Sequence, residues 1–118
     1  MKAAIRRLHS PDISDLEGWI PDSPESFGFL LQALIGPEDS MGQESFDFVV
    51  CTPDWLRRKY GQDAVLLLRN HVIVFGYDFS RIRATLEKQV GRMHGNNWQE
   101  LAKQLAQIGR WEFEGYEE

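Results

Sequence analysis

The chain has 118 residues with a hydrophobic fraction of 42%, which is enough for one domain with its own apolar core. An aromatic content of 12% and a charged content of 26% exclude a disordered or low-complexity chain. The single cysteine excludes an internal disulfide framework and is typical of a reducing intracellular compartment. We therefore predict one domain over residues 1–118 that folds without a disulfide or a structural metal.

Charge is distributed in blocks along the sequence, and the formal net charge is −5. Residues 1–7 carry three basic groups, and residues 8–56 carry ten carboxylates with no Lys or Arg. Residues 57–110 carry ten basic and four acidic groups, and residues 111–118 add four glutamates. If the carboxylates of the first half share a face, they attract a basic partner. The alternative is an ordinary solvated surface.

The first half of the chain predicts three strands. Residues 3–8 can form the first strand, which ends where Pro11 restricts the backbone. In residues 27–35 every second side chain is apolar, and the run stops at the turn pair Gly36-Pro37. Residues 43–51 alternate in the same way, and the short connection between these two strands predicts an antiparallel hairpin.

The next segment predicts a helix followed by a strand. In Thr52-Pro53-Asp54, the Thr is expected to be the N-cap, with Pro and Asp in the first turn, and Gly61 is a plausible end. Residues 64–68 are ambiguous between helix and strand. The β-branched content of residues 71–75 predicts a strand.

Two amphipathic helices are predicted after that strand. Asp78 is the expected N-cap of the first, whose apolar residues recur every three or four positions as far as Met93. The second is capped by one of the pair Asn96-Asn97 and covers residues 98–108. Gly109 is predicted to end it in a left-handed conformation.

The alternation of residues 110–116 predicts a final strand, with Trp111 and Phe113 facing the core and the charged side chains outward. The element order is then β, β, β, α, β, α, α, β. Because no helix separates the first three strands, we predict an α+β fold. Its sheet is mainly antiparallel with about five strands, and the helices pack on one face.

Motifs for metals, cofactors and nucleic acid are weak. The histidines are scattered and Cys51 has no second cysteine nearby, so neither a metal site nor a cofactor is expected. Cys51 follows an apolar run and is interpreted as a packed thiol rather than a nucleophile. The basic residues between 57 and 110 are spread around the polar side of a helix, so direct binding of nucleic acid is not expected. No membrane span or targeting segment is expected either.

The C-terminal part of the sequence resembles a known family. Its ending is similar to that of the immunity protein 8 family from bacterial polymorphic toxin systems. The similar ending is Trp98-Gln99-Glu100-Leu101-Ala102 to Leu105, then Ile108-Gly109-Arg110-Trp111-Glu112-Phe113-Glu114-Gly115-Tyr116. Residues 21–27, 43–46, 51–56 and 76–78 fall in the order that the family shows, so the resemblance covers nearly the whole chain. Gly115 stands where an acidic residue is expected.

The resemblance implies an immunity protein, without enzymatic activity, in the cytoplasm of a bacterium with a polymorphic toxin or contact-dependent growth inhibition system. Such a protein binds the C-terminal effector domain of its cognate toxin, here expected to be a basic nuclease, and blocks it. An acidic inhibitor can act as an electrostatic mimic of nucleic acid. We therefore place the contact on the following carboxylates of the acidic region and the tail: Asp12, Asp15, Glu17, Asp22, Glu25, Glu38, Asp39, Glu112 and Glu114.

Two hypotheses from other classes stay open. A small hydrolase would use Glu112 and Glu114, which share one strand face, as acid and base. A self-associating module, for example a homodimer, would pair through the edge of the 27–35 strand or of the 111–113 strand.

Overall fold

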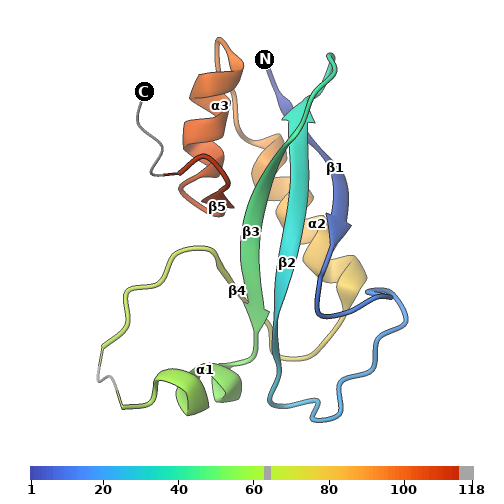
Figure 1. Ribbon diagram of the computed structural model, residues 1–118, viewed down its shortest axis with the longest axis vertical. Coiled ribbons are helices and arrows are strands. Elements are labelled where there is room, and N and C mark those ends of the chain that lie inside the picture. The colour runs from blue at the N-terminus through green and yellow to red at the C-terminus, as the bar shows by residue number, and fades with distance from the viewer. Residues whose placement is uncertain (63–64, 115–118) are drawn as a thin grey trace.

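Three long strands form the centre of the sheet in the computed structural model, which describes residues 1–62 and 65–114. Strands β1 (Ala3–His9), β2 (Gly28–Pro37) and β3 (Glu44–Cys51) follow one another as an antiparallel meander (Figure 1). The predicted hairpin between the second and third strands is therefore confirmed.

Two short strands share the remaining edge of β3. Strand β4 (His71–Ile73) runs parallel to the C-terminal half of β3, and β5 (Arg110–Trp111) runs antiparallel to the N-terminal half. The sheet thus has five strands and is mostly antiparallel. With three helices in the predicted order, the α+β fold class is confirmed.

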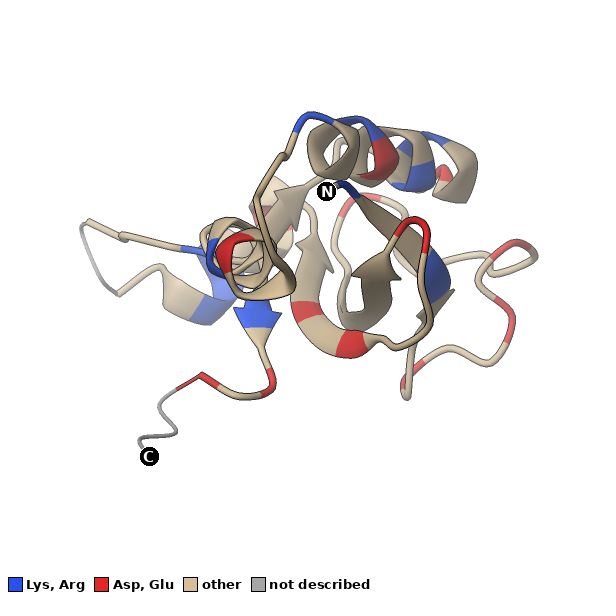
Figure 2. Cartoon of the chain, turned by 90° about the horizontal axis from the view of Figure 1, so that it is seen from above, with Lys and Arg blue, Asp and Glu red and all other residues tan. Residues whose placement is uncertain are grey.

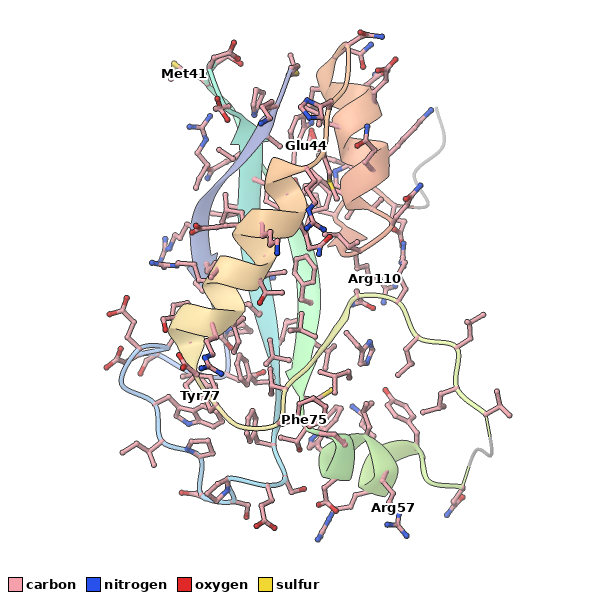
Figure 3. All side chains as sticks on the ribbon, turned by 180° about the vertical axis from the view of Figure 1, so that it is seen from behind. Met41, Glu44, Arg57, Phe75, Tyr77 and Arg110 are labelled. Atoms are coloured by element: carbon pink, nitrogen blue, oxygen red, sulfur yellow. The ribbon has the colours of Figure 1, made fainter. Side chains whose placement is uncertain are left out.

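Two of the helices cover one face of this sheet. Helix α2 (Phe79–Gly91) crosses behind β1 and β2, and α3 (Trp98–Leu105) lies beside its upper end (Figures 1 and 3). Helix α1 (Pro53–Tyr60) has no buried residue and lies at the end of β3. The side chains of α1 therefore remain available for contacts outside the core.

The apolar alternation of the strands positions the core between the sheet and these two helices. On β2 and β3, every second side chain is buried, and these residues are Phe29, Leu31, Ala33, Ile35, Phe46, Phe48 and Val50. The helices add Ile82, Leu86, Val90, Leu101 and Leu105, and all of these belong to one hydrophobic cluster. The apolar stripe predicted for each of these two helices is therefore confirmed.

All three predicted helix caps are present. The Oγ1 atom of Thr52 accepts a hydrogen bond from the amide of the third helical residue at 3.3 Å. Asp78 does the same for α2 at 3.3 Å, and Asn97 does so for α3 at 2.9 Å. These side chains satisfy amide groups that the first helical turn leaves without a partner.

The prediction for Gly109 is wrong. Helix α3 ends at Leu105, and its C-cap is Ala106 in a right-handed conformation. Among the described residues, the positive φ angles belong to Gly42 and Asn70. The position favours glycine for a steric reason instead. A Cβ atom at residue 109 would lie 2.8 Å from the ring of Phe48, which is closer than van der Waals contact.

The predicted final strand is shorter than expected. Strand β5 ends at Trp111, and the next residues form a turn in which the amide of Glu114 donates to the carbonyl of Trp111 at 3.0 Å. Phe113 is 42% exposed, so it is not the core residue that the alternation predicted. The rest of the predicted strand, residues 115 and 116, lies outside the described part. The fourth strand is also shorter than predicted and ends at Ile73.

Candidate partner-binding surfaces

Five of the predicted contact residues come together in the connection between β1 and β2. We call residues 10–27 the acidic loop, because it contains five exposed carboxylates and no Lys or Arg. The carboxylates are those of Asp12, Asp15, Glu17, Asp22 and Glu25. Figure 2 shows red segments along this loop, at the right of the molecule.

Apolar side chains hold the acidic loop on the sheet. Ile13 and Leu16 are buried, and the ring of Trp19 meets those of Phe27 and Tyr77 edge to face at 5.4 Å and 4.8 Å. The hydroxyl of Tyr77 donates to the carbonyl of Leu16. Burial, helped by the nearby charge of Asp15, raises the pKa of Tyr77 to about 12, so the hydroxyl stays protonated and keeps this bond at neutral pH.

The carboxylates of the acidic loop have two different roles. Asp12 accepts a hydrogen bond from the amide of Leu30 at 2.9 Å, and Asp15 accepts one from Gly18 at 3.2 Å. These two side chains fix the shape of the loop. Glu17, Asp22 and Glu25 make no hydrogen bond or ion pair within residues 1–62 and 65–114. They are therefore the carboxylates best able to contact a partner.

The other four predicted contact residues lie elsewhere. Glu38 and Asp39 are on the turn between β2 and β3, at the opposite end of a molecule whose longest dimension is 42 Å. Glu112 and Glu114 follow β5 (Figure 2). The nine residues therefore do not form one site, although they are close in two stretches of sequence.

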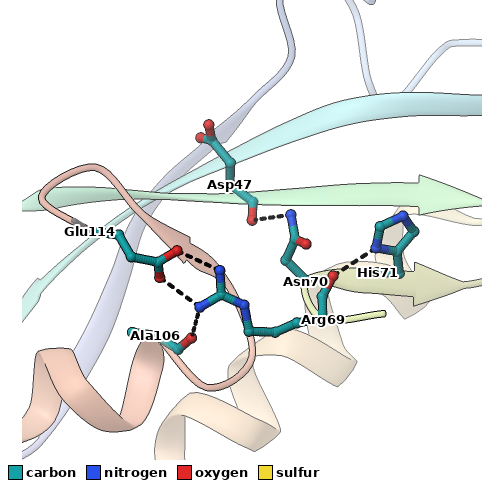
Figure 4. Close-up of polar contacts among 6 residues, drawn as sticks. All are labelled: Asp47, Arg69, Asn70, His71, Ala106 and Glu114. Atoms are coloured by element: carbon teal, nitrogen blue, oxygen red, sulfur yellow. Dashed lines mark hydrogen bonds and ion pairs between the residues drawn. The ribbon is translucent and has the colours of Figure 1, made fainter. Parts of the chain in front are cut away.

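Glu114 is engaged in an ion pair within the chain. The guanidinium of Arg69 donates to both carboxylate oxygens of Glu114, at 2.6 Å for one of them, and to the carbonyl of Ala106 at 2.8 Å (Figure 4). Arg69 lowers the pKa of Glu114 below its usual value. A carboxyl of this kind is ionised at neutral pH and is a poor general acid, which argues against the hydrolase hypothesis.

Cys51 is fully buried at the end of β3, as the interpretation of a packed thiol requires. Burial raises the pKa of its thiol to about 11. The thiol is therefore protonated at neutral pH, and the nucleophilic thiolate is scarce. Within the described ranges, no group of three or more metal-binding side chains is placed to hold an ion. Nor does any helix there have the length and apolar character needed to cross a bilayer.

The structure also shows exposed apolar side chains that the sequence pattern did not predict. Phe75, just after β4, is 90% exposed, and Val65 and Leu67 in the preceding loop are also strongly exposed. The apolar run from Val65 to Leu68 is the sequence signal for the exposed side chains of this loop. Periodicity does not distinguish a buried apolar run from an exposed one, so the sequence leaves residues 64–68 ambiguous between helix and strand.

A groove lies next to Phe75, and we call it the β4 groove. It has a volume of about 480 Å³, and its lining includes Ile73, Phe75, Tyr77, Arg81 and Ile82. A second groove of about 580 Å³ is lined by Glu17 and Trp19 of the acidic loop and also by Tyr77. Tyr77 and Asp78 line both grooves and therefore connect the acidic loop to the β4 groove.

The fold and these surfaces define a small α+β protein with the exposed charged and apolar features that protein interfaces use. The chain belongs to the immunity protein 8 family, because the family model described as Immunity protein 8 matches residues 3–116. The resemblance stated from the sequence is thus confirmed, and the family implies an immunity role. Searches of curated proteins and of solved structures each found no match.

Proposed function

We propose that this chain is a non-enzymatic inhibitor that binds the C-terminal effector domain of its cognate toxin in a one-to-one complex. The complex forms in the bacterial cytoplasm and protects the cell within a polymorphic toxin or contact-dependent growth inhibition system. The observation that carries this proposal is the acidic loop, in which five exposed carboxylates occur without a single Lys or Arg. Family membership supports the immunity role itself.

The chemistry of the acidic loop favours a basic effector such as a nuclease. Enzymes that act on nucleic acid present basic side chains to the phosphate backbone. A cluster of carboxylates attracts such a surface over long distances and can occupy it in place of phosphates. Ile13, Leu16 and Trp19 hold the loop in place before binding, which lowers the entropy lost on association.

A rescue assay tests the proposal. The C-terminal domain of the large secreted protein encoded beside this gene is expressed with and without the chain, and surviving cells are counted. We expect survival only in the presence of the chain, and a one-to-one complex on purification. A neighbouring domain that is harmless, or that kills equally in both cases, would refute the proposed function.

A further inference from the structure

The apolar surface around β4 is the feature that the core and the proposed function leave unexplained. Phe75 is 90% exposed and Ile73 is 42% exposed, and both line the β4 groove. Large exposed side chains beside an apolar groove typically mark a protein interface. Strand β4 is also an edge strand, because its only pairing within the described sheet is with β3.

Opposite charges flank this apolar surface. On one side lies Glu17 of the acidic loop, in a groove that shares Tyr77 and Asp78 with the β4 groove and is also lined by Arg83. Asp78 forms an ion pair with Arg81 at 3.5 Å, so the charges of these two groove residues offset each other. On the other side, helix α1 presents Arg57 and Lys59, which are both exposed. Figure 3 shows the order directly, with Tyr77 next to the acidic loop, Phe75 in the middle and Arg57 on α1 beyond it.

A surface with an apolar centre between an acidic side and a basic side is complementary to a copy of itself. A rotation of 180° about an axis through the centre brings the acidic side of one copy onto the basic side of the other. The apolar centres then meet on the axis. We propose that two copies of this chain associate through the β4 groove, with Phe75 of each copy in the groove of the other.

The same rotation places the acidic loop of each copy against α1 of its partner, so this dimer and the proposed toxin complex exclude each other, and binding of the toxin releases the second copy. This arrangement differs from the dimer predicted from strand edges. Strand β2 has β1 on one edge and β3 on the other, so it offers no free edge to a second copy.

The first test is sedimentation equilibrium of the full chain over a range of concentrations, with Phe75→Asp as the variant. We expect a wild-type dimer and a dissociation constant at least ~30-fold weaker in the variant, as for a central aromatic contact. Met41→Asp is the matched control, because Met41 is 96% exposed at the opposite end of the molecule (Figure 3). Circular dichroism checks that both variants are folded, which we expect because both side chains are outside the core.

A charge exchange then tests the predicted orientation. One variant combines Glu17→Lys with Asp22→Lys, and the other combines Arg57→Glu with Lys59→Glu. Each alone should weaken the dimer, and an equimolar mixture of the two should form a heterodimer tighter than either homodimer. A wild type that stays monomeric at ~100 μM, or a Phe75→Asp variant that dimerises normally, would overturn the proposal. If the wild type is monomeric and Phe75→Asp instead abolishes rescue, the groove belongs to the toxin contact.

Discussion

Glu44 connects three elements through a single carboxylate. It begins β3, and its two oxygens accept hydrogen bonds from the indole nitrogens of Trp98 and Trp111, each at 2.7 Å. The ring of Trp111 also stacks on Phe46 with a centroid distance of 6.4 Å. Because Trp98 begins α3 and Trp111 ends β5, this half-buried carboxylate holds the C-terminal part of the chain on the sheet.

Replacing Glu44 with Gln should destabilise the fold. The amide keeps one acceptor oxygen but turns an NH₂ group toward the second indole, so one partly buried N–H loses its partner. We expect a loss of about 2 kcal/mol in the free energy of unfolding. Urea unfolding followed by tryptophan fluorescence measures it. Glu38→Gln, on the exposed β2–β3 turn, is the control, and equal stability of the two variants would contradict the role assigned to Glu44.

The elements that the sequence predicted well are those whose signals are local. The sequence identifies Thr52, Asp78 and one of the pair Asn96-Asn97 as caps, because an N-cap bonds to an amide only a few residues away, and the structure selects Asn97. The predictions for Gly109 and for the final strand failed because distant residues decide them. Phe48 of β3 occupies the space beside Gly109, and Arg69 binds the residue at which the strand was expected to continue.

Alanine substitutions at Gly109 and Gly91 test whether the packing of Phe48 against residue 109 restricts that position. In Gly109→Ala, the added methyl group meets the buried ring of Phe48, and we expect a loss of about 1–3 kcal/mol in the free energy of unfolding. In Gly91→Ala, at the exposed end of α2, a Cβ atom has nothing within 4 Å. Higher helix propensity should stabilise that variant by up to about 1 kcal/mol. Thermal unfolding measures both, and effects of the same sign would contradict this account.

At the scale of the whole molecule, the charge blocks of the sequence predicted only part of the surface. The stretch from Asp12 to Glu25 remains together because one connection contains it, whereas Glu38 and Asp39 are carried to the far end by the length of β2. The exposed apolar surface near Phe75 was not predicted, because an apolar run looks the same whether its strand is central or at an edge. Whether an apolar strand residue is buried or exposed depends on the order of the strands in the sheet, which the sequence pattern does not specify.

This separation of charges makes a prediction about the rate of toxin binding. Reversing Glu17, Asp22 and Glu25 to Lys should slow association with the effector domain by at least ~10-fold at low salt and weaken the salt dependence of that rate. The fold should persist, because these three side chains are exposed and make no hydrogen bond in residues 1–62 and 65–114. The control reverses Glu38 and Asp39 at the opposite end, where their effect on steering toward the acidic loop is smaller because Coulomb attraction falls with distance. Stopped-flow measurements at several salt concentrations distinguish the two variants. Equal rates for wild type and the loop variant would show that the acidic loop does not guide the toxin.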